Sequence, residues 1–278
     1  MSVLSSTTKK WFKGNCPLFF AFVCCFSAEI VFLISSGFRF HFVREIVPYA
    51  LLFGFSFAIA NIFLTFSLQK GSLSITGLII SYSLLLPTLY GILFLKETVG
   101  VPFFIGLLLL LISAFLIHST SNKSENSSQK KNSKKMFVVW LIFVSLAFVG
   151  NGFCSIFQTM QQKAFDGAYK SEFMILALSA ASLAILPVSL ITEHQQIREN
   201  MKGVLFFGIP SGLSTGLINL FVMYAVNILS ASLIFPLISG AGLLLTVLVG
   251  LLFFKEKFTP RQYVGLVLGI ASIVLFNL

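Results

Sequence analysis

The chain has 278 residues, of which 57% are hydrophobic and only 10% are charged, with a formal net charge of +10 and a mean hydropathy of +0.96. Ordinary soluble domains carry about a quarter charged residues. This composition therefore excludes a soluble catalytic module and predicts an all-α integral membrane protein. The Lys and Arg residues lie in short stretches between apolar runs, where they direct membrane topology, which argues against nucleic-acid binding.

A helix that crosses a bilayer needs about 20 apolar residues. Nine segments satisfy this requirement, and in chain order they cover approximately residues 16–36, 46–68, 73–95, 101–118, 136–160, 172–192, 203–226, 230–254 and 262–277. Residues 119–135 separate the fourth segment from the fifth. This stretch is rich in Ser, Asn and Lys and has no apolar periodicity, so we expect a flexible polar linker.

The two halves of the chain share an internal duplication. Residues 84–118 align with residues 243–277 without a gap, 159 positions apart, and 14 of the 35 positions are identical. Further matches upstream need a shift of one residue. The informative pairs are Gly54 with Gly212, Asn61 with Asn219, Lys96-Glu97 with Lys255-Glu256, Gly106 with Gly265, and Ser113 with Ser272.

The repeat predicts two units of opposite orientation. The second half, residues 136–278, contains five spans, and the first half, residues 1–118, contains four that match the last four of that unit. We therefore expect a first repeat that lacks its first helix, a linker over 119–135 and a complete second repeat. Two copies of a five-helix unit insert with opposite orientation, and such inverted repeats are typical of secondary transporters.

The loop charges predict an orientation in the membrane. If the chain crosses nine times, most of its 19 Lys and Arg residues lie on the side of the N-terminus. The positive-inside rule then places the N-terminus and the linker in the cytoplasm and the C-terminus outside.

One motif occurs in both halves and carries a family likeness. An apolar helix runs into Lys-Glu, and a short loop leads to a Gly-bearing apolar helix, once as PTLYGILFLKETVGVPFFIGLLLLLISAFLI and again as GLLLTVLVGLLFFKEKFTPRQYVGLVLGIASIVLF. The sequence resembles the EamA repeat of the drug/metabolite transporter superfamily. The resemblance implies ten helices in two inverted bundles around a central cavity, with alternating access and without ATP hydrolysis. It also implies the export of small metabolites or cationic drugs, and a C-terminus in the cytoplasm, opposite to the charge count.

Glu29 lies inside the first apolar segment. A charged side chain within a span costs about 2.5–3.5 kcal/mol on insertion scales and is by default a functional candidate. We consider two interpretations of equal weight. Glu29 faces a cavity as a cation site or proton relay, or it is a protonated carboxyl that is hydrogen-bonded to a neighbouring hydroxyl.

Three amides lie within apolar segments. Asn61 and Asn219 occupy equivalent positions in the two repeats, and Asn151 lies between two glycines, which would permit local unwinding beside a cavity. An amide offers both donors and acceptors to a zwitterionic or hydroxylated substrate. The alternative is hydrogen bonding between helices, worth about 0.6 kcal/mol per pair on average.

Two prolines interrupt apolar segments in the two halves. Pro87 and Pro236 each remove a backbone hydrogen bond, so we expect kinked helices that either line and gate a cavity or are static. Further candidate substrate contacts near these prolines, or able to stack on a substrate, are Ser81, Tyr82, Tyr224 and Ser239. By contrast, Glu97 and Glu256 each end a span beside a Lys, and we interpret them as structural groups at the membrane interface.

The sequence shows no nucleotide-binding loop, no metal-binding pattern and no spacing of its four Cys residues that indicates a disulfide. The function that these features predict is secondary transport, in the export direction, of small organic metabolites such as amino acids across the plasma membrane, with a proton as a possible coupling ion. The alternatives are efflux of cationic drugs and a non-transporting scaffold or inactive transporter. No cofactor is expected, and the oligomeric state stays open.

Overall fold

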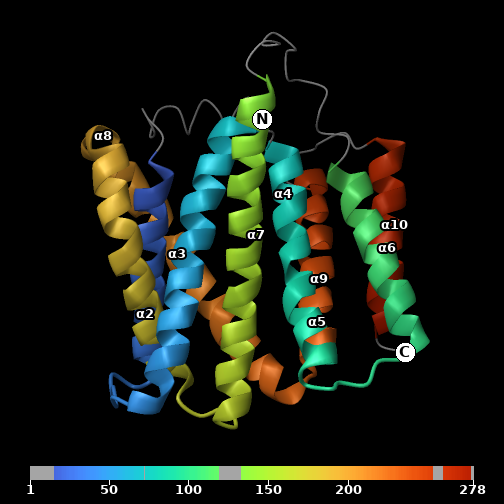
Figure 1. Ribbon diagram of the computed structural model, residues 1–278, viewed down its shortest axis with the longest axis horizontal. Helices are drawn as coiled ribbons and strands as arrows, with labels where there is room; N and C mark the ends of the chain where they lie inside the picture. The colour runs from blue at the N-terminus through green and yellow to red at the C-terminus, as the bar shows by residue number, and fades with distance from the viewer. Residues whose placement is uncertain (1–15, 72, 119–132, 253–258, 277–278) are drawn as a thin grey trace. The chain divides into compact units, whose positions relative to one another are not determined.

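The computed structural model describes residues 16–71, 73–118, 133–252 and 259–276, and of residues 73–74, 118, 133–135, 243 and 246–252 it describes the backbone alone. This part of the chain is helical and contains no strand (Figure 1). The helices are α2 (Pro17–Ser35), α3 (Val47–Lys70), α4 (Leu73–Ser81), α5 (Leu85–Leu93), α6 (Val101–His118), α7 (Ser133–Ala164), α8 (Lys170–Ile228), α9 (Ala231–Leu252) and α10 (Pro260–Phe276). Two short 3₁₀ turns are also present. The turn η1 (Arg44–Ile46) directly precedes α3, and the turn η2 (Tyr82–Leu84) connects α4 with α5.

The helices confirm the predicted membrane fold class. Each of the nine apolar segments expected from the sequence coincides with helical residues in the described part of the chain. Five helical stretches there, among them Pro17–Ser35 and Met136–Ala164, are long and apolar enough to cross a bilayer on their own. The predicted linker over 119–135 lies almost entirely outside the described residues.

Helix α8 contains two of the expected spans. Its 59 residues would measure about 90 Å if straight, roughly twice the thickness of a bilayer. Along α8, the residues of α2 that it contacts first become earlier in the chain and then later. The contacting pairs, in α8 order, are Ser182 with Glu29, Glu193 with Leu18, Gly208 with Val23, and Gly216 with Val31. The segment 170–193 therefore runs antiparallel to α2, and the segment 204–228 runs parallel to it.

The helices form two compact units. Unit 1 contains residues 1–65 and 153–228, and unit 2 contains residues 66–152 and 229–278. Each unit combines helices from both sequence repeats, because equivalent helices of the two repeats pack against each other. Packing thus divides the chain differently from the duplication, whose boundaries at residues 118 and 136 stay a prediction.

In unit 2, α6 and α10 are equivalent helices that contact each other reciprocally. A Cβ atom added to Gly106 would lie 3.1 Å from the carbonyl oxygen of Ser272. A Cβ added to Gly265 would lie 3.1 Å from the carbonyl oxygen of Ser113. Gly265 lies 159 positions after Gly106, and Ser113 lies 159 positions before Ser272, so the two pairs exchange equivalent residues between the helices. Such exchange of roles is the mark of a twofold axis, here within one chain.

The ends of the same two helices show their relative direction. The rings of Phe103 and Phe276 lie 5.5 Å apart, and the equivalent positions are joined by a hydrogen bond of 3.3 Å from Gln262 Nε2 to the carbonyl of Ile117. The start of each helix therefore meets the end of the other. The two copies of this helix run in opposite directions, as the odd number of spans per repeat predicts.

Unit 1 contains a second reciprocal interface. A Cβ on Gly54 would lie 2.6 Å from the carbonyl oxygen of Ala177, and a Cβ on Gly212 would lie 2.5 Å from the carbonyl oxygen of Cys24. The two glycines are 158 positions apart, and their partners are 153 positions apart. Residues of α2 are thereby paired with residues 153 positions later in α8. Small residues let backbones approach closely where lipid provides no hydrophobic driving force.

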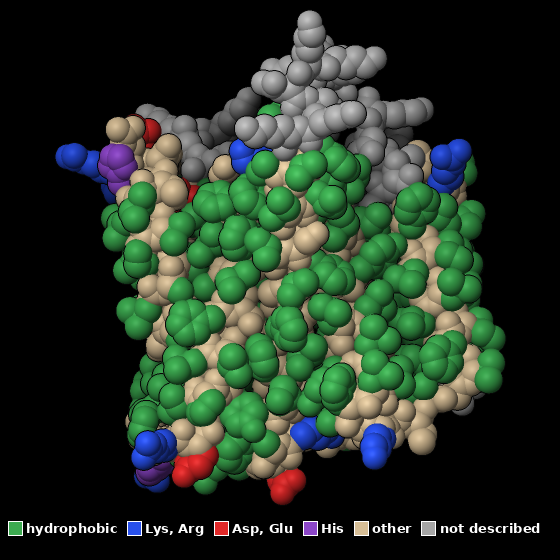
Figure 2. All heavy atoms as spheres, in the orientation of Figure 1, with side chains coloured by type: hydrophobic (Ala, Val, Ile, Leu, Met, Phe, Trp, Pro, Cys, Tyr) green, Lys and Arg blue, Asp and Glu red, His purple; other side chains and the backbone are tan. Residues whose placement is uncertain are grey.

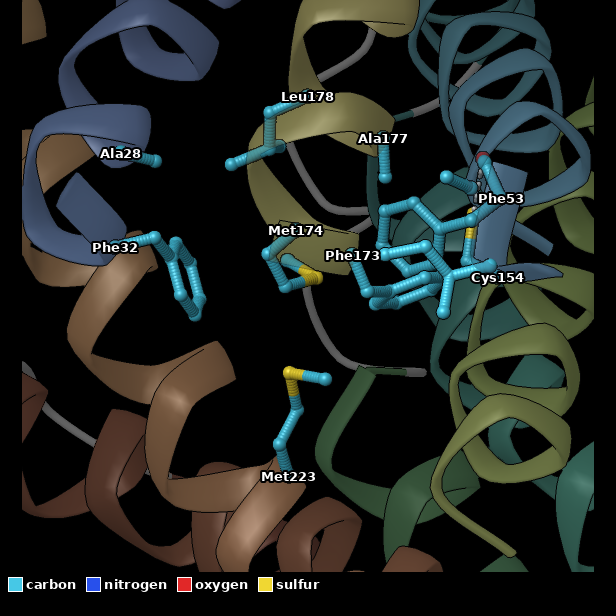
Figure 3. Packing of buried hydrophobic residues seen from close by; sticks show 11 residues of the cluster. Ala28, Phe32, Phe53, Cys154, Phe173, Met174, Ala177, Leu178 and Met223 are labelled. Carbon is cyan, nitrogen blue, oxygen red and sulfur yellow. Dashed lines mark hydrogen bonds between the residues drawn. The ribbon is translucent and has the colours of Figure 1, made fainter. Parts of the chain in front are cut away.

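Buried apolar side chains pack around this interface in unit 1. Phe32 of α2, Phe53 of α3, and Phe173 and Met174 of α8 are almost fully buried. Figure 3 shows Ala28 and Phe32 on one side of the cluster and the rings of Phe53 and Phe173 beside Cys154 on the other. This core holds α2, α3 and α8 in a defined register, which positions Glu29.

Candidate functional site

Glu29 meets its own symmetry equivalent. It lies on α2, half-buried, and Ser182 lies 153 positions later on α8. The Ser182 hydroxyl donates a hydrogen bond of 3.5 Å to Glu29 Oε1. A residue can contact its own equivalent only beside the twofold axis. The carboxylate therefore lies at the centre of the reciprocal interface of unit 1, with an acid on one side and a hydroxyl on the other.

The hydroxyl groups of Ser182 and Ser179 on α8 compensate the charge of Glu29 only in part. At 3.5 Å the bond from Ser182 is longer than the usual 2.5–3.0 Å between hydroxyl and oxygen, and is correspondingly weak. Cys25 and Phe32, about one turn away on either side, are buried apolar residues. No ion pair to Glu29 occurs within the described part of the chain. Such a carboxylate can take up either a proton or an organic ammonium group.

The two equivalent amides make the same local bond. Asn61 Nδ2 donates to the carbonyl of Phe57 at 2.9 Å, and Asn219 Nδ2 donates to the carbonyl of Thr215 at 2.9 Å. Each bond stays within its own helix, and within the described part of the chain neither amide nitrogen donates to another helix, as the interhelical alternative would require. Both side chains are half-buried in unit 1, the unit that also holds Glu29.

Asn151 has a structural partner in unit 2. Its Nδ2 donates a 2.6 Å bond to the hydroxyl of Ser83, which itself donates to the carbonyl of Ile80 at 2.6 Å. Helix α7 is continuous from Ser133 to Ala164, so the predicted unwinding at Asn151 does not occur. The adjacent Gly152 instead lets Leu86 approach so closely that an added Cβ would lie 2.3 Å from its Cδ1.

Four of the predicted site residues line one small cavity in unit 2: Ser81, Tyr82, Pro236 and Ser239. The Tyr82 hydroxyl donates to the carbonyl of Leu111 at 2.8 Å, which holds the ring against α6. The cavity has a volume of only about 10 Å³, room for a single water. The structure therefore brings these residues together without leaving space for a solute.

The two prolines act differently in their helices. Pro87 stands near the start of α5, directly after the 3₁₀ turn η2 that interrupts the apolar segment. Pro236 lies inside α9, which stays α-helical from Ala231 to Leu252. The sequence predicts the same effect for both, and only the first helix shows an interruption.

Tyr224 lies at one end of unit 1. Its exposed ring faces Lys170, whose ammonium nitrogen lies 5.0 Å from the ring centroid. This cation–π contact gives the predicted stacking surface a partner within the protein.

Two acidic residues cap helices across long sequence separations. Glu97 accepts hydrogen bonds from the backbone N–H groups of Ala231 and Ser232, at 2.8 and 2.7 Å. This interaction specifies the structural role that the sequence predicts for Glu97, because its carboxylate binds the N-terminus of α9. Its sequence equivalent Glu256 lies outside the described residues.

Glu193 makes the corresponding contact in unit 1, with the N–H groups of Leu18 and Phe19 at 3.0 and 2.9 Å. A helix N-terminus carries unsatisfied donors and partial positive charge, so a carboxylate stabilises it. Glu193 is not among the site residues that the sequence pattern predicts. Among the described residues, no group of three or more His, Cys, Asp or Glu side chains is placed to hold a metal ion.

Similarity to known proteins shows the family of this chain. The sequence model of the EamA-like transporter family matches residues 136–278, about half of the chain. The chain belongs to the EamA-like transporter family. This EamA-like protein is therefore a multi-pass protein of the cell membrane.

Two further similarities agree with the family. The EamA-like chain is 36% identical over 53 residues to the multidrug resistance protein EbrA of Bacillus licheniformis, a match that covers 19% of this chain and half the length of that relative. It also superposes on a crystal structure described only as that of a protein, with a TM-score of 0.73 and 15% identity, over 100% of this chain and 94% of the other. At that identity the second likeness shows the fold alone.

Proposed function

We propose that this EamA-like transporter is a secondary exporter of small organic solutes that carry an amine, amino acids or related compounds, and that it works by alternating access. The observation that carries the proposal is the position of Glu29 beside Ser182, where two inverted copies of one helix meet. Because the two copies are inverted, equivalent helix surfaces surround this single acid on both sides. A solute can therefore approach it in the same way from either side of the membrane.

The packing beside Glu29 supports a mechanism of helix movement. At this interface Gly54 and Gly212 each lie directly against a backbone carbonyl of the opposing helix, in equivalent positions of the two copies. Two packings that differ by exchange of the equivalent helices have similar contacts, and therefore similar free energies. Alternating access by inverted repeats depends on such an equivalence.

The chemistry of the site favours an ammonium-bearing solute. Glu29 is half-buried and lacks an ion pair within the described residues, so a bound amine would neutralise it. The amides of Asn61 and Asn219 add hydrogen-bonding capacity in the same unit for the polar groups of a zwitterion. A proton that competes with the amine for one carboxylate would couple export to a proton gradient.

Efflux of cationic drugs is the second candidate. It is favoured by the carboxylate at Glu29 and by the similarity to a multidrug resistance protein over 53 residues. The two candidates differ in what they require of the substrate. An amino acid exporter recognises the carboxylate as well as the amine, whereas a drug exporter accepts bulky cations without a carboxylate.

Proteoliposomes that contain the purified full chain test the proposal. Flux of labelled amino acids, their decarboxylated amines and cationic dyes is measured with and without an imposed proton gradient. We expect amine-bearing solutes to move and the gradient to accelerate them. Absence of flux for every member of the panel would contradict transport of this solute class, and movement of dyes alone would favour the drug exporter.

A further inference from the structure

Unit 1 contains a second polar site, at the end of α2 opposite its N-terminus. A cavity of about 350 Å³ opens there between the loop that follows α2 and the start of α8. We call it the vestibule. Its polar lining includes Ser36, Arg39, His41, Lys170, Ser171 and Tyr224. Its volume lies at the lower end of the range for small-molecule sites, roughly 300–1,000 Å³.

The charge of the vestibule is predominantly positive. Arg39 and Lys170 are cationic, His41 adds a third basic group, and Glu172 is the acid among the lining residues. Figure 2 shows Lys or Arg and His side chains beside an acidic side chain at the lower left, at this end of α2 and α3. The hydroxyls of Ser36 and Ser171 and the N-terminus of α8 add donors and partial positive charge. This combination suits a small anion.

The start of α8 forms one wall of the vestibule, and contacts with the loop before it and with the end of α8 hold it in place. Gly167 has a φ of +77°, and a Cβ there would lie 2.3 Å from Asn227 Nδ2. Asn227 donates a 2.9 Å bond to the buried side chain of Gln162. Lys170 donates to the carbonyl of Gly167 and lies over the ring of Tyr224. The ammonium group is thereby held at the cavity instead of extending freely into solvent.

The vestibule and Glu29 lie on the same helix at different depths. Ser36 follows Glu29 by seven residues, which is about 10 Å along a helix axis. The ammonium and carboxylate of an α-amino acid are attached to one carbon, so a single molecule cannot span both places. One solute would therefore occupy the two places in succession, with its carboxylate held in the vestibule and its amine at Glu29.

We propose that the vestibule binds the carboxylate of the transported solute through Arg39 and Lys170, as a station on the route to or from Glu29. This inference rests on the proposed function, and it names the chemical group that the second site recognises. It also makes a prediction that the site at Glu29 does not. Changes to the vestibule should not alter KM for solutes that lack a carboxylate.

The test compares an amino acid with its decarboxylated amine in proteoliposomes. We expect Arg39→Gln and Lys170→Gln to raise KM for the amino acid about tenfold, the effect of losing one charge-assisted hydrogen bond, and to leave KM for the amine unchanged. The control is Arg44→Gln, which removes an exposed cation near this loop that does not line the cavity. An equal effect on both solutes, or none on the amino acid, would overturn the proposal.

One further measurement distinguishes a solute carboxylate from a lipid headgroup as the anion in the vestibule. Another distinguishes failure of this proposal from failure of the proposed function. Flux in purely zwitterionic liposomes should show the same difference between variants. If the difference needs an anionic phospholipid, the vestibule binds headgroups and the proposal is wrong. If the wild type moves neither solute, acetate should still slow thiol labelling of Ser36→Cys and not of an exposed Glu199→Cys control. Equal labelling with and without acetate would overturn the site itself.

Discussion

Glu29 and Ser182 are equivalent residues of two inverted copies, and they contact each other across the local twofold axis of unit 1. The duplication has therefore placed one acid and one hydroxyl at the same symmetric point. A symmetric interface could accept the acid from either copy, because the surrounding backbone contacts are nearly the same in both directions. This relationship makes the role of the acid testable separately from its position in the sequence.

Moving the acid between the copies is the most direct test. We expect Glu29→Ser to abolish flux of amine-bearing solutes, since the carboxylate that would neutralise the ammonium is lost. Adding Ser182→Glu in the same chain should restore a measurable part of the flux, because the new carboxylate reaches the same point from α8. Flux from proteoliposomes checks this, with Glu199→Gln as an exposed acidic control. A double variant as inactive as Glu29→Ser would show that the acid is not acting at the symmetric point.

Proton coupling is tested at the same residue. Glu29→Gln keeps the size and hydrogen-bonding capacity of the side chain and removes its titration. We expect any remaining flux in this variant to be independent of an imposed proton gradient, whereas the wild type responds to it. Measuring initial rates across a range of pH with a fixed solute gradient would reveal the difference. Unchanged gradient dependence in Glu29→Gln would exclude Glu29 as the proton carrier.

The reciprocal glycines should be intolerant of a methyl group. We expect Gly54→Ala and Gly212→Ala each to lower the free energy of unfolding by about 1–3 kcal/mol, because the added Cβ would lie 2.5–2.6 Å from a backbone oxygen that cannot move alone. Thermal unfolding in detergent measures the effect. Gly242→Ala is the matched control, since its Cβ would meet nothing within 4 Å. Equal stability of all three variants would contradict the close approach of the helices.

The cap on α9 should contribute to stability without touching a substrate. We expect Glu97→Ala to lower the free energy of unfolding by about 1–2 kcal/mol, since two N–H groups at the N-terminus of α9 lose their acceptor. Glu97→Gln should cost less, because the amide oxygen can still accept one bond. Lys96→Ala, at the neighbouring position, should have little effect. If Lys96→Ala were the more damaging change, an ion pair rather than the cap would explain this motif.

The bond between Asn151 and Ser83 can be isolated by a double-mutant cycle. We expect Asn151→Ala and Ser83→Ala to be non-additive, with a coupling of about 0.6–1.7 kcal/mol, the range for interhelical bonds in membranes. Detergent unfolding of the wild type, both single variants and the double variant provides the measurement. Strict additivity would mean that the 2.6 Å contact does not stabilise the fold.

By itself the sequence determined the helices and their duplication. The segment expected at residues 101–118 is helical over the same residues, Val101–His118, and the other spans agree within a few residues. The exceptions are α8, which joins two expected spans in one helix, and the span at 73–95, which η2 divides. The agreement has a physical reason, because a bilayer requires about 20 consecutive apolar residues, a condition that can be counted along the chain. The acid at position 29 was visible for the same reason, since a charge inside such a run is exceptional.

Only the tertiary structure decided which residues meet. The alignment of the halves uses an offset of 158 or 159, and few identities connect α2 with α8, so the pairing of Glu29 with Ser182 at an offset of 153 emerged from contacts alone. The partners of Glu97 and Glu193 were hidden for a related reason. A carboxylate near the end of a span can bind any nearby helix N-terminus, and which one is nearby depends on packing between segments more than 130 residues apart.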